Sequence, residues 1–213
     1  MPQTPSALLL ISTRCPHCPS VLQSLCELIK EGKIANLEVV NIGQDPERAQ
    51  TLNVRSVPWL KLGEFELVGL KSKTEILQWI DRSTQTNDMS AYFEELMTTG
   101  EISKVQQLVE KQPENMQTLL DIMADETSSL SARVGVGAII EQLAGSEILI
   151  NAIDALGEHC KNPRARVRND ACYYLGLSHH PNAKKYIQPL LKDSDDEVRE
   201  VAQEAFNEIK YDS

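Results

Sequence analysis

The feature that most constrains the fold is a pair of close cysteines in Cys15-Pro16-His17-Cys18. A continuous aliphatic run at residues 7–11 precedes it, which is the pattern of a strand buried on both faces. A helical pattern from Ser20 to Ile29 follows it. Cysteines at i and i+3 in a first helical turn lie on one face, within reach of a disulfide. A strand, Cys-x-x-Cys and a helix in this order indicate thiol–disulfide chemistry.

The residues after the motif predict a small mixed α/β domain. Its elements are expected in the order β-α-β-α-β-β-α. The strands are expected at 7–11, 37–42, about 58–62 and 65–68, and the helices at 20–29, from 46 to about 52, and at 74–80. The first two strands are joined by a helix and should therefore be parallel. Asp45 is the expected N-cap of the second helix, with Pro46 at its first position.

This element order resembles the thioredoxin/glutaredoxin family over about residues 5–82. The motifs that carry the resemblance are Cys15-Pro16-His17-Cys18 and Val57-Pro58, about 40 residues apart. Cys-Pro-His-Cys is similar to the active site of bacterial periplasmic disulfide oxidases. Pro19 and the compact length look more like glutaredoxin-like protein disulfide oxidoreductases. The resemblance implies redox activity that uses the Cys15–Cys18 disulfide and no other cofactor.

The two cysteines are expected to have different roles. Cys15 lies at a helix N-terminus, where free N–H groups and the helix dipole favour a thiolate, and Arg14 and protonated His17 add positive charge. We therefore predict that Cys15 is the exposed attacking sulfur and Cys18 the shielded resolving one. A stabilised thiolate also stabilises the reduced form, which predicts an oxidising or isomerase-like poise.

In the family, the proline that matches Pro58 is cis and faces the sulfurs, and the backbone of the residue before it pairs with the substrate. The resemblance thus implies that Val57 and Pro58 bind substrate. Trp59 replaces the usual threonine and is expected either in the core or as an aromatic wall beside the sulfurs. The sequence also departs from the family because residues 5–14 contain no acid that would help to ionise Cys18.

Two alternatives for the motif remain open. A structural zinc site needs four ligands, and the first half adds only His17 to the two cysteines, so we expect no metal. An unreactive thioredoxin-like scaffold is the other alternative. Cys26 falls on the apolar face of the helix pattern and is expected to be a core thiol.

The second half differs from the first in its charge, which predicts two domains, at residues 1–83 and 84–213. Residues 1–83 carry nine Lys/Arg and nine Asp/Glu, whereas residues 84–213 carry twelve and 22 and hold the whole net charge of −10. The polar stretch 81–90 is expected to be a linker. Helices are predicted at 90–98, 101–111, 113–124, 129–144, 146–158, 164–177, 182–192 and 196–210.

An internal repeat runs through this half, because the segments 132–138, 165–171 and 196–202 resemble one another, and we describe them by the motif Asp/Asn-x-x-Val-Arg-x-x-Ala. We align Val134, Val167 and Val198, which gives spacings of 33 and 31 residues. The motif resembles HEAT-like repeats, whose helix pairs stack into a solenoid that binds proteins along its concave face. The basic residues Lys161, Arg164, Arg166 and Arg168 are expected to brace neighbouring acids rather than to bind a partner. The spacing of His159, Cys160, Cys172, His179 and His180 matches no zinc pattern and predicts two core cysteines and loop histidines.

The sequence favours a thiol–disulfide oxidoreductase that acts on a protein client, which the helical half would present or select. An electron donor or acceptor is also required. The alternative is an interaction protein whose helical half carries the function. The acidic charge argues against a nucleic-acid partner. No apolar run approaches the ~20 residues of a membrane span, and no signal segment is recognisable, so we expect a cytoplasmic protein without a membrane partner.

Overall fold

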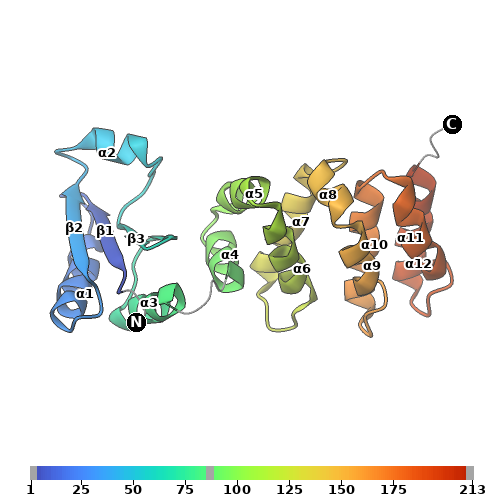
Figure 1. The fold of residues 1–213 in the computed structure, drawn as a ribbon, viewed down its shortest axis with the longest axis horizontal. Coiled ribbons are helices and arrows are strands. Elements are labelled where there is room, and N and C mark those ends of the chain that lie inside the picture. Colours follow the sequence, from blue (N-terminus) through green and yellow to red (C-terminus); the bar gives the residue numbers. More distant parts are fainter. Residues whose placement is uncertain (1–3, 85–88, 210–213) are drawn as a thin grey trace. The chain divides into compact units, whose positions relative to one another are not determined.

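The computed structural model describes residues 4–84 and 89–209 and divides the chain into two compact units, Met1–Asp88 and Met89–Ser213 (Figure 1). The first is a small α/β unit and the second is helical. The elements of the first unit are β1 (Ser6–Ile11), α1 (Cys18–Lys30), β2 (Asn36–Asn41), α2 (Pro46–Thr51), β3 (Trp59–Leu62), β4 (Phe65–Val68) and α3 (Lys73–Thr84). Their order is the predicted one.

The four strands form one mixed sheet in the order β2-β1-β3-β4. β1 and β2 are parallel, with Leu9 opposite Val39, and β3 is antiparallel to both β1 and β4. The turn of the β3–β4 hairpin uses Gly63 at φ +55°, a conformation that suits glycine. The C-terminal end of β1, the start of β3 and the end of β4 therefore lie at the same end of the sheet.

Each face of the sheet is covered by helices because the side chains of the strands alternate between its faces. On one face, Leu10 and Trp59 pack with Ala49 of α2, and partly buried aliphatics such as Leu8 and Val40 surround them. α1 and α3 pack against each other and bury Val21, Leu25, Leu28, Ile76 and Trp79. The end of β1 that leads into the Cys15 loop is thus packed through Leu10 against Trp59 and α2.

Two expectations for this unit are wrong. Cys26 is an exposed free thiol, not a core residue. Leu25 and Leu28 already fill the buried arc of α1, and Cys26 lies about 100° round the helix from Leu25. The expected linker at 81–90 is also too long, because α3 extends to Thr84 and α4 begins at Met89. Residues 85–88 lie outside the described residues.

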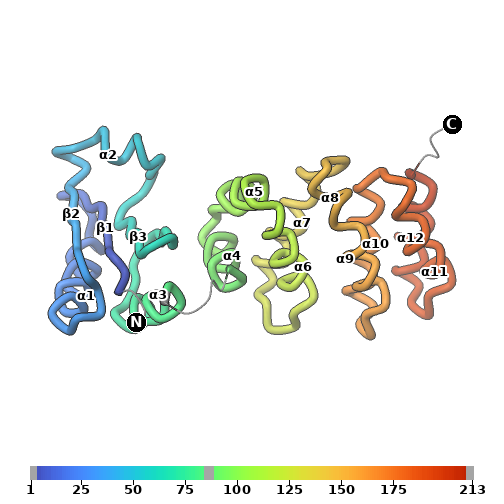
Figure 2. The backbone as a smooth tube through the Cα atoms, viewed as in Figure 1, coloured from blue at the N-terminus to red at the C-terminus, as the bar shows by residue number. Residues whose placement is uncertain are grey.

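The second unit consists of helices that pack mainly on their neighbours in the sequence (Figure 2). They are α4 (Met89–Thr98), α5 (Ile102–Lys111), η1 (Pro113–Asn115), α6 (Met116–Ala124), α7 (Leu130–Gln142), α8 (Glu147–Asn151), α9 (Ile153–His159), α10 (Ala165–Leu177), η2 (Pro181–Ala183), α11 (Lys184–Leu190) and α12 (Asp196–Glu208). The helix expected at 146–158 is interrupted at Ala152, which separates α8 from α9. α7, α10 and α12 pack in series, and Gly176 lets α10 approach Ala205 of α12 closely.

The burial pattern of α7, α10 and α12 differs from the predicted alignment of the sequence repeat by two residues in the first copy. Val134 is 63% exposed, whereas Val167 and Val198 are fully buried. The N-caps of α7, α10 and α12 are Ser129, Arg164 and Asp195. Three residues after these caps come Ala132, Val167 and Val198, all with 0% exposure. Ala132 is therefore the equivalent of the two buried valines.

In the corrected register, the fourth residue after each N-cap is an arginine that donates to a carbonyl of the loop before its own helix. These bonds are Arg133 Nη1 to Ser128 O (2.5 Å), Arg168 Nη1 to Asn162 O (2.9 Å) and Arg199 Nη1 to Asp193 O (2.7 Å). Each arginine thus holds the entry to its helix in one geometry. The same kind of arginine contact is therefore present at the starts of α7, α10 and α12.

Candidate active site

The cysteine pair lies in the loop between β1 and α1, at the end of the sheet where β1 stops. Cys15 and Cys18 form a disulfide with their Cα atoms 5.5 Å apart. The N–H of Cys15 donates to Ser12 O at 3.2 Å, which turns the chain after the strand. α1 begins at Cys18 with His17 as N-cap and Pro19 in its first turn. The Cys15-Pro16-His17 segment is therefore a leading turn ahead of the regular helix.

The two sulfurs have different surroundings, as the sequence predicts. Cys15 is half-buried, whereas Cys18 is only 2% exposed and belongs to the core. The backbone N–H of Cys18 points at Cys15 Sγ over 3.1 Å. An N–H group at a helix N-terminus stabilises a thiolate at that sulfur once the disulfide is reduced. This geometry gives Cys15 the access and the charge stabilisation of a nucleophile, and it shields Cys18.

The Val57–Pro58 segment lies directly beside Cys15. The Val57–Pro58 peptide bond is cis, as the resemblance implies. Cys15 Sγ lies 3.6 Å from the carbonyl oxygen of Val57. A disulfide sulfur has no proton, so this is a contact in the oxidised state, and a Cys15 thiol would donate across it. Pro58 is buried, while Val57 is half-buried and can be reached from solvent.

The remaining predicted site residues divide between surface and core. Arg14, Pro16 and His17 are exposed around Cys15. Trp59 is only 3% exposed and packs with Leu10 and Ala49. Of the two places expected for Trp59, the core and an aromatic wall for the substrate beside the sulfurs, the structure shows the core. Val57 packs against the same cluster, so Trp59 belongs to the apolar group that supports the Val57 segment.

Sequence reasoning missed two supports of this site. The Asn41 amide at the end of β2 donates to Thr13 Oγ1 at 3.2 Å and thereby ties β2 to the loop that carries Cys15. The N–H of Gly69 donates to Pro58 O at 2.9 Å, which brings the segment after β4 against the proline. Leu70, the next residue, is 51% exposed. The available signal was topological, because both segments follow strands that end near Cys15.

The basic cluster of the helical unit has internal partners. Arg164 donates to Ala124 O at 2.6 Å and pairs with Glu126 at 2.9 Å, and Arg166 donates to Met123 O at 3.0 Å. These carbonyls belong to the C-terminal turn of α6, where cations are stabilising. Lys161 pairs with Glu158 on the surface. The expectation that these residues brace their own fold is thus supported for Arg164 and Arg166, whereas the Lys161 pair is exposed to solvent.

Arg168, the last member of the basic cluster, contacts the loop that precedes α12. Its Nε and Nη2 atoms donate to the Asp193 carboxylate at 2.8 and 2.7 Å. The two side chains are only 13% and 8% exposed. These hydrogen bonds lower the pKa of Asp193. Arg168 thus braces an acid of the loop before α12, which is the bracing role expected for the Val-Arg arginine.

The other cysteines of the helical unit are core residues. Cys160 and Cys172 are buried free thiols, as predicted. Burial raises the pKa of each to about 12. Within residues 4–84 and 89–209, no three His, Cys, Asp or Glu side chains gather as a metal ion would require. The same ranges contain no helix with the length and apolar character of a membrane span.

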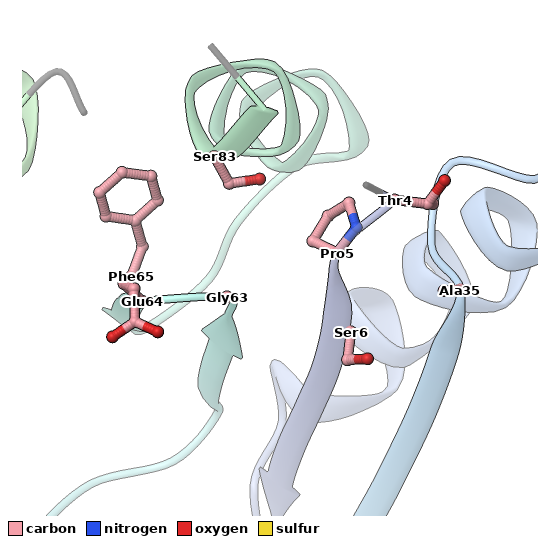
Figure 3. A pocket seen from close by; sticks show the side chains of 8 residues that line it. All are labelled: Thr4, Pro5, Ser6, Ala35, Gly63, Glu64, Phe65 and Ser83. Atoms are coloured by element: carbon pink, nitrogen blue, oxygen red, sulfur yellow. The ribbon is translucent and has the colours of Figure 1, made fainter. Parts of the chain in front are cut away.

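A pocket of about 720 Å³ opens at the other end of the sheet (Figure 3). It is lined by Thr4, Pro5, Ser6, Ala35, Gly63, Glu64, Phe65 and Ser83. Ser6 begins β1, whereas Cys15 follows its end. The pocket is therefore remote from the disulfide, and its lining contains no cysteine or histidine.

Comparison with protein families supports the assignment of this unit. Residues 7–81 match the family model described as Thioredoxin domain. The match spans every element from β1 to most of α3 and includes both cysteines. The first unit is therefore a thioredoxin-like domain, and together with the close cysteine pair it suggests thiol–disulfide redox activity. No curated protein matches the chain.

Proposed function

We propose that the protein is a thiol–disulfide oxidoreductase that acts on protein dithiols and disulfides through Cys15 and Cys18. The observation that carries this proposal is the asymmetry of the pair. The sulfur of Cys15 is accessible and receives the N–H of Cys18 at 3.1 Å, while Cys18 is 2% exposed. A stabilised outer thiolate with a shielded partner suits attack followed by resolution.

The exchange has two steps in the reductive direction. The Cys15 thiolate attacks one client sulfur, so that the client S–S bond breaks and a Cys15–client bond forms. The displaced client sulfur leaves as a thiolate and takes up a proton. Cys18, after losing its proton, then attacks Cys15 and releases the second client sulfur as a thiolate. Two electrons pass to the client, a separate dithiol re-reduces the pair, and the reverse sequence oxidises a client dithiol.

Val57 is proposed to hold the client chain beside Cys15. Its carbonyl oxygen lies 3.6 Å from Cys15 Sγ. Among the described residues, its N–H makes no hydrogen bond, so it is available to an extended client segment. Backbone pairing of this kind orients a substrate without demanding one sequence. The pair itself serves as the redox group, and the proposal requires no further cofactor.

The helical unit is proposed to be a HEAT-like solenoid that presents or selects the client. The recurring arginine contact of α7, α10 and α12 supports a repeat architecture. Leu130 and Val134 lie one turn apart on α7 and are 70% and 63% exposed. We propose that these two side chains are part of the surface that contacts the client. The proposal also places the exchange in the cytoplasm, where unpaired thiols such as exposed Cys26 persist.

The same exposed pair favours a second candidate, a non-enzymatic adaptor whose helical unit carries the function. A Cys15→Ser/Cys18→Ser double variant separates the two. If it keeps full partner binding and full cellular activity, the adaptor is correct and the enzyme is not. The enzyme predicts loss of cellular activity with partner binding retained.

A redox titration tests the enzyme directly. The protein is equilibrated in buffers of graded dithiol/disulfide ratio and then alkylated. Mass spectrometry counts the alkylated cysteines at each ratio. We expect Cys15 and Cys18 to interconvert as one two-electron pair, while Cys15→Ser shows no such transition. The wild type should also turn over insulin disulfides in the presence of a dithiol. The proposal fails if the Cys15–Cys18 disulfide does not form reversibly.

A further inference from the structure

The rim of the disulfide site has a one-sided charge. It is built by three segments at the same end of the sheet: residues 12–17 after β1, 53–58 before β3, and 69–71 after β4. They meet through the contact of Cys15 with Val57 O and through the bond from Gly69 to Pro58 O. These three segments contain Arg14, His17, Arg55 and Lys71 but no Asp or Glu. This excess of positive charge is unusual for the unit, since the formal charges of residues 1–83 as a whole sum to zero.

The rim cations differ from other cations of the unit in their partners. Arg48 pairs with Glu38, and Lys73 pairs with Glu27 and Glu31. In contrast, Arg14 and Arg55 are exposed and have no ion pair or hydrogen-bond partner among the described side chains. The acids nearest to Arg55 in the sequence are Glu47 of α2 and Glu64 in the turn at the other end of the sheet, and neither forms an ion pair with it among the described residues. Arg14 and Arg55 therefore carry positive charge that no described side chain pairs with, whereas Lys71 is buried and engaged within the fold.

The rim also offers apolar contact. Leu70 is 51% exposed directly after Gly69, and Val57 is half-buried beside Cys15. A peptide paired with the Val57 backbone would pass between these side chains and the two arginines. Unpaired guanidiniums favour carboxylates, both by attraction at long range and by hydrogen bonds at contact. An apolar residue of the same peptide would cover Leu70.

We propose that the site selects client cysteines in acidic segments that also carry an apolar residue, and that Arg55 and Leu70 are determinants of this specificity. This inference rests on the proposed function. Acidic clients approach faster because the rim attracts them, and lysine-rich clients are repelled. The preference for acidic over basic clients is electrostatic, so it should weaken as salt screens the charges.

Two synthetic peptides test the proposal. Each has one internal disulfide and one leucine and carries a fluorophore–quencher pair, and the two differ only in glutamates or lysines flanking the cysteines. The protein is reduced with a small dithiol, freed of it, and mixed with each peptide in single-turnover reactions. We expect the acidic peptide to react roughly ten times faster than the basic one at low salt, and the ratio to approach one at about 1 M salt.

Two charge-reversal variants distinguish an effect of the rim charge from an effect of the net charge of the protein. Arg55→Glu should abolish or reverse the preference, whereas Lys33→Glu, an equal change at an exposed site beyond the far end of α1, should preserve it. Leu70→Ser should slow both peptides by the same factor. Equal wild-type rates for the two peptides, or an unchanged preference in Arg55→Glu, would overturn the inference alone. Failure of reduced wild type to react with either peptide would instead overturn the proposed function.

Discussion

The two units place the same residue types in opposite circumstances. In the helical unit, Arg164, Arg166 and Arg168 are engaged by carbonyls and carboxylates of their own fold. At the rim of the disulfide, Arg14 and Arg55 have no such partner among the described residues. Braced arginines contribute to stability and lose their availability to ligands. Arg14 and Arg55 keep that availability, and we therefore propose them, rather than the braced arginines, as contacts for a client.

The cysteines divide in the same way. Cys160 and Cys172 lie in the apolar interior of the helical unit, and burial raises their pKa to about 12. Cys15 is half-buried and receives an N–H from the first turn of α1. Of these three cysteines, only Cys15 combines access to solvent with an N–H donor at its sulfur.

The largest expected effect that tests this contrast is in thiol labelling. After reduction, we expect iodoacetamide at pH 6 to alkylate Cys15 first, because its sulfur alone combines access with an N–H donor. Exposed Cys26 should follow, and Cys160 and Cys172 should react on the order of 10³-fold or more slowly than Cys15. Peptide mapping over time measures the three classes. Labelling of Cys160 in the folded protein at the rate of Cys15 would break the comparison.

A smaller effect concerns the braced arginines. Arg168→Ala leaves Asp193, only 8% exposed at its side chain, without its bidentate partner. We expect a loss of about 2 kcal/mol in the free energy of unfolding of the helical unit, since breaking a largely buried pair strands the other charge. Urea unfolding followed by circular dichroism measures the change.

Lys161→Ala is the matched control for that variant. Its pair with Glu158 is exposed, with side chains 66% and 69% accessible, so its removal should leave the urea midpoint unchanged. Equal effects of the two substitutions would contradict the assignment of Arg168 as the brace between helix pairs.

The smallest expected effect is a pH dependence of the same brace. Hydrogen bonds from Arg168 lower the pKa of Asp193 in the folded state. The pair therefore contributes fully above the ordinary aspartate pKa of about 4, and its contribution is lost as the pH falls below that value. The stability difference between wild type and Arg168→Ala should be constant from about pH 5 to 8 and shrink near pH 3. A difference that grows on acidification would have the wrong sign for this mechanism.

The sequence predicted the first unit well because strong local signals agree with one another. The aliphatic run at 7–11, the Asp45-Pro46 helix start and the glycine turn at Gly63 all match the observed elements. The different exposures of Cys15 and Cys18 followed from the position of the motif ahead of a helix. Exposed Cys26 did not follow, since a helical pattern does not fix the width of the buried arc.

In the second unit, the elements were predictable but the repeat register was not. The tripeptide Ala-Arg-Val occurs at both 132–134 and 165–167, so an alignment by residue identity pairs Val134 with Val167. The real register is set by where each helix begins. α7 starts after Ser129, whose hydroxyl accepts from the Ala132 N–H, but the N-cap of α10 is Arg164, which makes no side-chain cap bond. A start without a capping residue leaves no sequence signal.

The rim of the site was the least predictable feature. Leu70 and Arg55 are far from Cys15 in sequence, and neither belongs to a recognisable motif. Their place depends on the order of β1, β3 and β4 in the sheet, and on the single bond from Gly69 to Pro58 O. Tertiary pairing of this kind is not encoded in local periodicity.

The central claim is that Cys15 is the attacking sulfur and Cys18 the resolving one. Its most direct test is trapping with a peptide disulfide of the acidic type, using Cys18→Ser and Cys15→Ser side by side. We predict that Cys18→Ser accumulates a stable mixed disulfide that mass spectrometry places on Cys15, and that Cys15→Ser accumulates none on Cys18. A persistent adduct on Cys18 in Cys15→Ser, with none on Cys15 in Cys18→Ser, would contradict the account.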